Sequence, residues 1–268
     1  MNDMSNLSNA VVSQSLAGRR LEHKSVILTG AAGSIGRYIS RHLLREGAKV
    51  TMTGRDPSKL DAFVEELSQE GFDAENITTI VGDCADPQVC RDIVSRAVDT
   101  FGKLDVLVNN AGNDERHRAD DISVEYWDDR IAVNLRHQFF ASREVARGMK
   151  ELGGGSIINF GSVQAYLSSP GMSGYAVSKY GVRGVTRTLA REFGKDNIRV
   201  NTLVPGWVMT ERQKRLWVDE EAEKMIDQVQ CLPGRLMPED VARMVLFLAS
   251  DDSAMCTAQD FIVDAGWV

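Results

Sequence analysis

Cysteine and histidine are scarce in this sequence. Four cysteines are spread over 268 residues without a Cys-x-x-Cys pair, and the four histidines lack a metal-ligand spacing such as His-Glu-x-x-His. A disulfide scaffold and a zinc site are therefore not expected, and we predict that no metal is bound. Free thiols are typical of a reducing compartment, which favours the cytoplasm.

Positive charge and long apolar runs are also in short supply. Lys and Arg number 31 against 38 Asp and Glu, so the formal net charge is −7. This balance argues against a broad basic surface for nucleic acid or anionic lipid. No apolar run approaches the roughly 18 residues of a membrane span, and the first basic residue, Arg19, lies too far along for the charged start of a secretory signal. We expect neither nucleic acid nor a membrane as a partner.

What the sequence does contain is a regular alternation of apolar runs and helical periodicity. The apolar runs expected as strands cover residues 25–29, 49–53, 77–81, 104–108, 156–160, 198–204 and 260–263. Helical spacing covers residues 33–46, 57–70, 87–101, 123–149, 174–193 and 238–249. Strands that are apolar on both faces belong to parallel sheets covered by helices. The pattern predicts an α/β fold of the Rossmann type, with three α/β/α layers and a doubly wound, seven-stranded parallel sheet.

The domain organisation follows from composition. Residues 1–23 are rich in Ser and Asn, and we expect them to form a flexible extension. No linker or composition shift divides residues 24–268, so a single domain is expected there.

A glycine-rich turn follows the first expected strand. It reads Gly30-Ala-Ala-Gly33-Ser-Ile-Gly36 and opens a helix. Glycines let the backbone approach a pyrophosphate, whose charge is stabilised at a helix N-terminus. An ordinary strand–helix turn is the alternative, but the position after the first strand favours a dinucleotide. The residues expected to hold it are Gly30, Gly33, Ser34, Ile35 and Gly36.

The end of the second strand bears on the choice of cofactor. A site for NAD usually has an acidic residue there to bind the ribose 2′-hydroxyl, whereas arginine accommodates the 2′-phosphate of NADP. Gly54 stands where the acid is expected, and Arg55 follows. We therefore favour NADP over NAD. The alternatives are that Arg55 is a solvated loop residue, or that Asp56 turns inward.

Tyr175 and Lys179 form a candidate acid–base pair. Their spacing of four places them on one face of a helix. A neighbouring ammonium favours a phenolate, so the pKa of Tyr175 is expected to fall toward the working range, and Tyr175 is then able to take a proton from an alcohol. A solvated helix pair is the alternative. Ser162 ends a parallel strand thirteen residues earlier, where ligand crevices form in α/β sheets.

Six motifs in order resemble the short-chain dehydrogenase/reductase family over residues 24–268. They are Thr-Gly-Ala-Ala-Gly-Ser-Ile-Gly (29–36), Asn-Asn-Ala-Gly (109–112), Asn134 in Val-Asn-Leu, Ser162, Tyr-Ala-Val-Ser-Lys (175–179) and Pro-Gly-x-Val-x-Thr (205–210). One departure is visible, because the family commonly has glycine where this chain has Ser34. The departure concerns the local backbone geometry of the turn and leaves the expected class of cofactor unchanged.

The resemblance implies a role for each matched residue. Tyr175 is the acid–base group, and Lys179 lowers its pKa and holds the nicotinamide ribose. Ser162 positions the substrate oxygen, and Asn134 supports a water that relays protons from Lys179. The further cofactor contacts that the resemblance implies are Asp83 and Cys84 at the adenine, Asn110, Ala111 and Gly112 beside the cofactor, and Pro205, Gly206, Val208 and Thr210 at the nicotinamide.

The loop after Gly112 is polar, which bears on the substrate. A pocket for acyl chains or steroids is lined mainly with apolar groups, whereas each desolvated sugar hydroxyl needs a hydrogen-bond partner. Such partners are expected from Asn113, Asp114, Gln164 and His117, and Trp207 either stacks on a sugar or packs in the core. We expect the following three charged side chains of the loop to be solvated: Glu115, Arg116 and Arg118.

Longer stretches resemble bacterial aldose 1-dehydrogenases. They are residues 110–117, 126–137, 158–162, 231–235 and 248–267. The resemblance implies oxidation of the anomeric hydroxyl of an aldose to the lactone, with the sugar bound at Asn113, Asp114, Ser162, Gln164, Tyr175 and Trp207. One alternative is an NADPH-dependent carbonyl or 3-oxoacyl thioester reductase. Another is a non-catalytic dinucleotide-binding regulator on the same fold.

Two further expectations concern a lid and the oligomeric state. The charged residues 207–232 resemble the mobile substrate lid of the family, with a solvated surface helix as the alternative. The resemblance also implies a homotetramer.

Overall fold

The structure is a computed structural model that describes residues 19–167 and 169–268. Its centre is one parallel sheet in the order β3-β2-β1-β4-β5-β6-β7. The strands are β1 (Ser25–Thr29), β2 (Lys49–Gly54), β3 (Ile77–Val81), β4 (Val106–Asn109), β5 (Gly155–Phe160), β6 (Ile198–Pro205) and β7 (Asp260–Val263). The winding reverses between β1 and β4, which places a crevice at their carboxyl ends. The predicted doubly wound, seven-stranded parallel sheet is confirmed.

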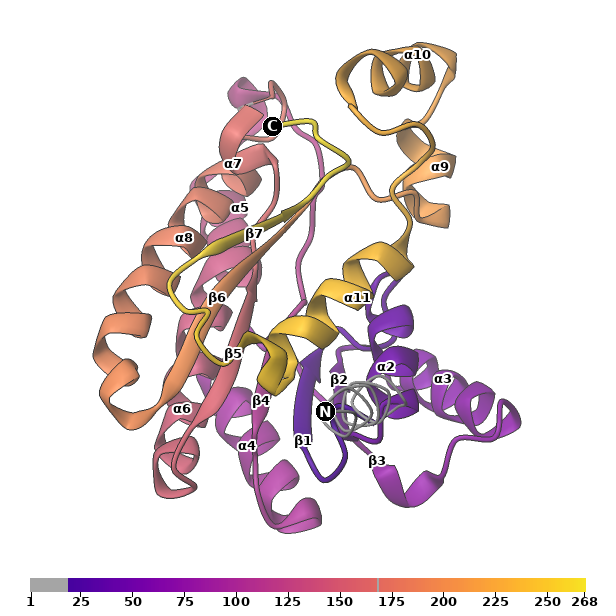
Figure 1. Cartoon of the computed structure of the whole chain (residues 1–268). Coiled ribbons are helices and arrows are strands. Elements are labelled where there is room, and N and C mark those ends of the chain that lie inside the picture. The colour runs from indigo at the N-terminus through magenta and orange to yellow at the C-terminus, as the bar shows by residue number, and fades with distance from the viewer. Residues whose placement is uncertain (1–18, 168) are drawn as a thin grey trace, which may run out of the picture.

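Helices cover both faces of this sheet (Figure 1). One layer consists of α2 (Gly36–Arg45), α3 (Pro57–Gln69) and α11 (Pro238–Ala249), and the other of α4 (Pro87–Phe101), α6 (His137–Glu151) and α8 (Ser173–Phe193). Each layer has its own apolar core, the first around Phe63 and the second around Met149. No helix in the described part of the chain is long and apolar enough to cross a membrane.

Local sequence explains where two of these helices begin. Asp56 and Asp86 precede α3 and α4, and each carboxylate accepts a hydrogen bond from a backbone N–H of the first turn, over 3.2 and 2.8 Å. Pro57 and Pro87 then occupy the first helical position, where the missing N–H costs no bond. The two helices therefore start as the sequence predicts.

The long helix predicted for residues 123–149 contains an irregularity that the periodicity does not reveal. It consists of α5 (Val124–Ile131), a π-helix η3 (Ala132–Arg136) and α6. A π-turn holds one extra residue per turn and is often found at functional sites. Asn134 lies at the centre of this turn.

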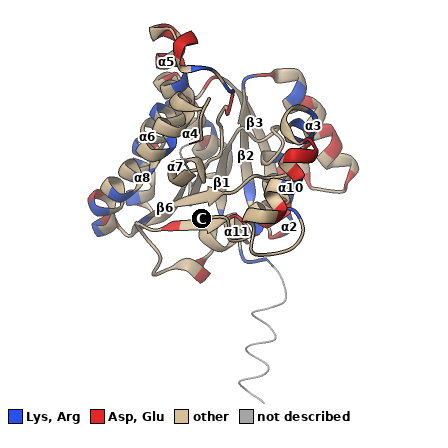
Figure 2. Ribbon diagram, turned by 90° about the horizontal axis from the view of Figure 1, so that it is seen from above, with Lys and Arg blue, Asp and Glu red and all other residues tan. Residues whose placement is uncertain are grey.

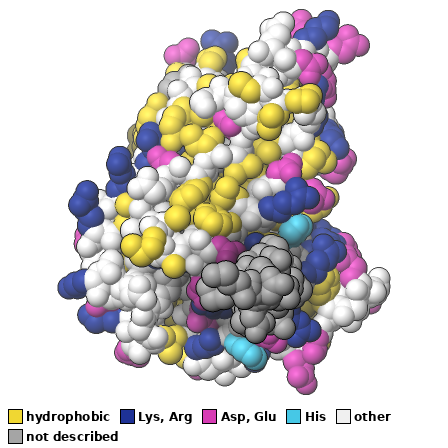
Figure 3. Space-filling view, in the orientation of Figure 1, with side chains coloured by type: hydrophobic (Ala, Val, Ile, Leu, Met, Phe, Trp, Pro, Cys, Tyr) yellow, Lys and Arg dark blue, Asp and Glu magenta, His cyan; other side chains and the backbone are white. Residues whose placement is uncertain are grey.

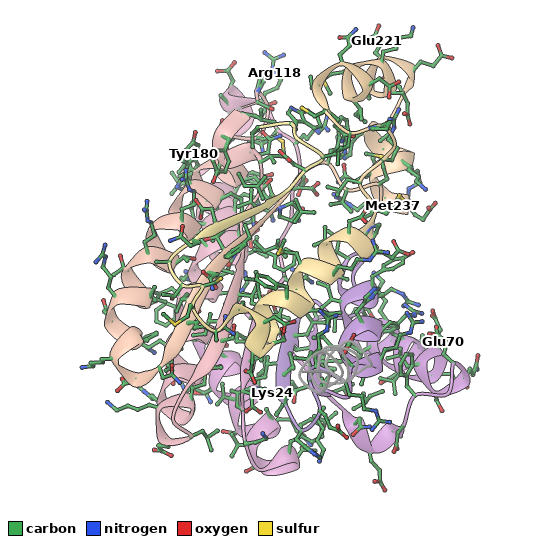
Figure 4. The ribbon with its side chains drawn as sticks, viewed as in Figure 1. Lys24, Glu70, Arg118, Tyr180, Glu221 and Met237 are labelled. Carbon is green, nitrogen blue, oxygen red and sulfur yellow. The ribbon has the colours of Figure 1, made fainter. Side chains whose placement is uncertain are left out.

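The remaining helices lie outside the two layers. α7 (Gln164–Leu167) was not predicted, and the lid region holds two helices, α9 (Glu211–Trp217) and α10 (Glu220–Val229). Figure 1 shows α9 and α10 standing apart at one end of the sheet. Acidic side chains occupy the first turn of α10 (Figure 2), and they include Glu221, which points away from the body of the protein (Figure 4). The described residues also contain four short 3-10 turns: η1 (Ala74–Asn76), η2 (Ala119–Asp121), η4 (Gly194–Asp196) and η5 (Asp251–Ser253).

The expected flexible extension over residues 1–23 needs a correction at its end. Leu21 is completely buried, and its N–H donates to the Glu46 carbonyl over 3.0 Å. The backbone N–H groups of Arg19 and Arg20 donate to the Glu46 carboxylate. This end of the expected extension is therefore part of the fold, because Leu21 packs in the core and the backbone beside it is hydrogen-bonded to Glu46. Residues 1–18 of the expected extension lie outside the described residues.

Candidate active site

A cavity of about 810 Å³ opens at the carboxyl ends of the strands. The residues predicted for the cofactor and the substrate line it, Gly30 and Trp207 among them, with the exception of His117. Asn134 does not line the cavity, since it is fully buried behind the loop that follows β4. The topology thus brings together residues from the carboxyl ends of six strands, β1 to β6, that are far apart in the sequence.

The glycine turn offers bare backbone to the cavity. Gly30 has φ +67°, in the left-handed region, and a Cβ at Gly36 would lie 2.2 Å from the Gly30 carbonyl oxygen. The first residue before α2, Ile35, provides no side-chain cap, so the N–H groups that begin α2 have no side-chain acceptor there. Uncapped N–H groups at a helix start suit an anion. The site therefore fits a pyrophosphate, and Ser34 lies on its wall with glycine at position 33 completing the turn.

At the ends of β2 and β3 the cavity wall carries a basic side chain beside an acidic one. Arg55 and Asp83 both line it, with 3.7 Å between the guanidinium and the carboxylate. Asp56, the alternative acid, instead accepts a hydrogen bond from the N–H of Lys59 and caps α3. Asp56 is thus held by the helix start and does not line the cavity, whereas Arg55 and Asp83 do.

Tyr175, Lys179 and Ser162 meet in the middle of the cavity. The helix α8 carries the first two on one face, and Lys179 Nζ lies 5.4 Å from the centre of the Tyr175 ring. Lys179 is almost completely buried and donates to the Phe160 carbonyl over 2.8 Å. Ser162 follows β5, and its hydroxyl accepts the N–H of Gln164 over 3.2 Å. A phenol, a hydroxyl and an amine are therefore gathered at one wall.

Burial dominates the acid–base properties of this group. It raises the pKa of Tyr175, although a hydrogen bond with Ser162 opposes the rise. It lowers the pKa of Lys179 to about 7, with the charge of Asp114 acting in the opposite sense. The expected lowering of the Tyr175 pKa by Lys179 is therefore not found in the protein alone. The reason is that burial penalises the charged phenolate. Burial also lowers the pKa of Lys179, so the ammonium that would stabilise the phenolate is less populated.

Asn134 connects the π-helix to the loop that follows β4. Its side-chain Oδ1 accepts the N–H of Asn113 over 2.8 Å, and its Nδ2 donates to the Asn113 carbonyl over 3.0 Å. The two bonds fix the backbone of Asn113 at the cavity wall. A Cβ at Gly112 would lie 3.2 Å from Asn134 Oδ1, so a larger residue there would require the Asn134 side chain to shift by a few tenths of an ångström.

The polar loop is bound to α9, which lies in the region that is expected to form the lid. Asp114 forms an ion pair with Arg212 and accepts a hydrogen bond from Gln213 Nε2 over 2.5 Å. Gln213 in turn accepts the indole N–H of Trp207 over 2.9 Å. Asp114 lines the cavity as predicted, but its carboxylate is already engaged by α9. We call this set, Asp114, Arg212, Gln213 and Trp207, the lid cluster.

One expectation about the loop is wrong. His117 does not line the cavity, since its ring contacts the Tyr126 hydroxyl over 3.0 Å and the Gly174 N–H over 3.4 Å. Arg116 is exposed as expected, but its guanidinium also lies 4.0 Å from the centre of the Trp217 ring on α9. Arg118, by contrast, points outward as expected (Figure 4).

The structure also adds residues that the sequence reasoning missed. His137 and Trp267 line the cavity, as do Leu167, Met172 and Met225 from the surrounding helices and loops. His137 is buried with neither ring nitrogen hydrogen-bonded, and burial lowers its pKa to about 3, so it is neutral. A signal for His137 was available, since it stands three residues after Asn134 in the same helical segment. No sequence pattern pointed to Trp267.

Comparison with known proteins agrees with this geometry. A family model described as "Enoyl-(Acyl carrier protein) reductase" matches residues 30–268. The chain is 42% identical over 247 residues to the D-xylose 1-dehydrogenase of Caulobacter vibrioides, covering 92% of this chain and 96% of that protein. It is 38% identical over 246 residues to the "Probable galactose dehydrogenase GalD" of Rhizobium meliloti, covering 92% and 95%.

A solved structure is similar over the same range. A 7α-hydroxysteroid dehydrogenase in complex with NADH and 7-oxo glycochenodeoxycholic acid has a TM-score of 0.86 at 29% identity, covering 93% of this chain and 96% of that one. The sequence match, the sheet order and the cavity all lead to one assignment. The chain belongs to the short-chain dehydrogenase/reductase family and is an oxidoreductase that acts on CH–OH groups.

Proposed function

We propose that this protein oxidises the anomeric hydroxyl of an aldose to the aldonolactone, with a nicotinamide dinucleotide as cofactor. The observation that carries the proposal is the 42% identity to a D-xylose 1-dehydrogenase over 92% of the chain. The similarity to a galactose dehydrogenase supports the same class of substrate. The polar side of the cavity, with Asn113, Ser162 and Gln164, provides partners for sugar hydroxyls.

The residues of the cavity divide the chemistry among them. Tyr175 takes the proton of the C1 hydroxyl, and Ser162 holds the same oxygen by a hydrogen bond. Lys179 holds the ribose of the cofactor, and Asn134 keeps the loop at Asn113 in place. The cofactor, when bound, supplies the acceptor for the C1 hydride. Closure of α9 excludes water from this step.

A panel of aldoses tests the proposal directly. We expect turnover with at least one of D-xylose, L-arabinose, D-galactose and D-glucose, measured as the absorbance of the reduced nicotinamide, with a lactone as the product. The same protein is offered 3-oxoacyl thioesters and a keto-steroid in the reducing direction. Turnover of one of these carbonyl compounds without turnover of any aldose would contradict the proposal and favour a carbonyl reductase.

We further propose that NADP is preferred over NAD, because Arg55 is the cationic side chain placed at the adenosine end. A charge-assisted hydrogen bond contributes about 1.5–3 kcal/mol, or about 10- to 100-fold in affinity. Arg55→Ala is expected to lower kcat/KM for NADP by about that factor and to change the value for NAD less than about threefold. Lys59→Ala, an exposed residue on α3 outside the cavity, is the matched control. An equal loss with both cofactors would overturn this preference.

Assembly into a homotetramer stays a prediction from the resemblance. Apolar side chains support it on the face that carries β7 and α11, where Figure 3 shows hydrophobic atoms gathered over these elements. Ile262 on β7 is 38% exposed.

A further inference from the structure

The segment Asp264–Val268 folds back over the end of the sheet after β7. The Asp264 carboxylate is almost completely buried and accepts three backbone N–H groups, from Gly266, Trp267 and Val268, over 2.8, 3.1 and 2.8 Å. Ala265 and Gly266 have positive φ of 59° and 83°, so the chain reverses sharply between them. One side chain thus determines the path of four residues.

The same segment lies against both ends of the lid. At the first end, Gly206 packs so closely on it that a Cβ there would lie 2.7 Å from Asp264 Cβ. At the second end, the N–H groups of Cys231 and Leu232 both donate to the Ala265 carbonyl, over 2.9 and 3.1 Å. Figure 1 shows this last stretch of chain running across the end of the sheet between α7 and the two lid helices. The fold-back segment is therefore a fixed base from which the lid projects.

This path brings Trp267 to the cavity wall beside Trp207. The two rings lie 6.3 Å apart between centres at an angle of 43°, and both line the cavity. Trp207 uses its indole N–H on Gln213, so its polar edge points into the lid cluster. The two indole rings therefore present carbon surface to the cavity. Ser162, Gln164 and Tyr175 present polar groups to the same cavity. A cavity with an aromatic wall and separate polar groups suits a ring with one apolar and one polar side.

We propose that Trp267 and Trp207 form an aromatic wall on which the C–H face of the substrate ring packs, and that Asp264 is the positioning residue that holds Trp267 in this wall. The proposal rests on the proposed function for the identity of the ring, a pyranose. Its C–H face contacts the indoles, while its hydroxyls remain free for the polar groups. Trp267 thereby selects cyclic substrates over extended ones.

The test measures binding separately from oxidation. The probe is 1,5-anhydroxylitol, a pyranose ring that lacks the anomeric hydroxyl and has nothing to oxidise at C1, titrated by calorimetry into the protein saturated with its cofactor. Trp267→Ala is expected to weaken this binding about tenfold, equivalent to about 1.4 kcal/mol. With an aldose it is expected to raise KM by the same factor and to lower kcat less than about threefold.

Companion variants separate the wall from general damage. Trp267→Phe keeps a ring and should recover most of the binding, whereas Asp264→Asn leaves one acceptor oxygen and should fall between wild type and Trp267→Ala. Trp127→Ala on α5, outside the cavity, is the matched control and should bind the probe as wild type does. Thermal unfolding of each variant shows whether a loss of binding comes with a loss of fold.

Each outcome decides a different question. If aldoses are oxidised and Trp267→Ala binds the probe as tightly as wild type, the aromatic wall is overturned and the proposed function stands. If wild type binds the probe and Trp267→Ala does not, but no aldose is oxidised, the wall stands and the proposed function is overturned. If wild type neither binds the probe nor oxidises an aldose, both are overturned.

Discussion

Replacing Tyr175 with phenylalanine is expected to lower kcat by about a thousandfold while cofactor affinity changes little. A positioned acid–base group typically contributes about 10²–10⁴ in rate. The substitution removes one oxygen and leaves the ring in its place, so the hydride-transfer geometry is retained without a group that takes the proton. The reaction is followed as cofactor reduction, and cofactor affinity is measured by calorimetry.

Tyr180→Phe is the matched control for this experiment. Tyr180 lies five residues further along α8 on its outer side, where it is 45% exposed (Figure 4). The same loss of a phenol oxygen there should leave kcat close to wild type. If Tyr175→Phe keeps wild-type turnover, another group must take the proton. If it loses cofactor affinity to the same extent as turnover, the role of Tyr175 is structural.

Replacing Lys179 with methionine is expected to stabilise the folded chain near neutral pH even as turnover falls. Burial lowers the Lys179 pKa from 10.5 to about 7. Since one pKa unit corresponds to 1.36 kcal/mol, this difference lowers the free energy of unfolding by an amount on the order of 4 kcal/mol at pH 7. The lost hydrogen bond to Phe160 offsets about 1 kcal/mol. For a chain of this length the remainder corresponds to a rise in Tm of roughly 6–12 °C.

The sign of the pH dependence distinguishes this effect from better packing. Between pH 7 and 10.5 the unfolded chain holds a proton on Lys179 that the folded chain lacks, so this group adds stability as the pH rises through that window. Methionine lacks the dependence, and its advantage over wild type should shrink toward pH 10.5. Calorimetric Tm values at several pH values check this. Lys195→Met, at an exposed position in η4 just after α8, is the control, and a pH-independent gain for Lys179→Met would contradict the argument.

Most of the fold could be predicted because it depends on local pattern. The runs of apolar residues from Ser25 to Thr29 and from Ile77 to Val81 became strands with the predicted bounds, and helix caps such as Asp86 are visible in the sequence. Leu21 was one exception, besides α7 and the π-turn. A single leucine in a polar segment carries no periodicity, and only the tertiary structure shows that it packs beneath α2.

The sequence could predict which residues line the site, but it could not predict which side chains those residues contact. The glycine turn, Tyr175 and Ser162 lie on the cavity because they end strands or begin helices at one edge of the sheet. The pairing of Asp114 with Arg212, 98 residues away, depends on where α9 closes. His117 was expected to face the substrate, yet the polar loop turns it toward Tyr126. Such side-chain contacts depend on which residues lie close together in the folded chain, and the spacing of residues along the sequence does not show this.

The π-turn between α5 and α6 has a consequence for how tolerant this region is of changes in length. Because the π-turn holds one residue more than an α-turn, the loss of one residue within Ala132–Arg136 would leave an ordinary α-turn, and α6 would keep its faces relative to α5. One residue gained there would instead rotate α6 by about 100° relative to α5. After such an insertion the buried Gln138 would take the exposed position that Phe139 now holds. The packing of α6 is therefore expected to tolerate the loss of a residue in this segment better than the gain of one.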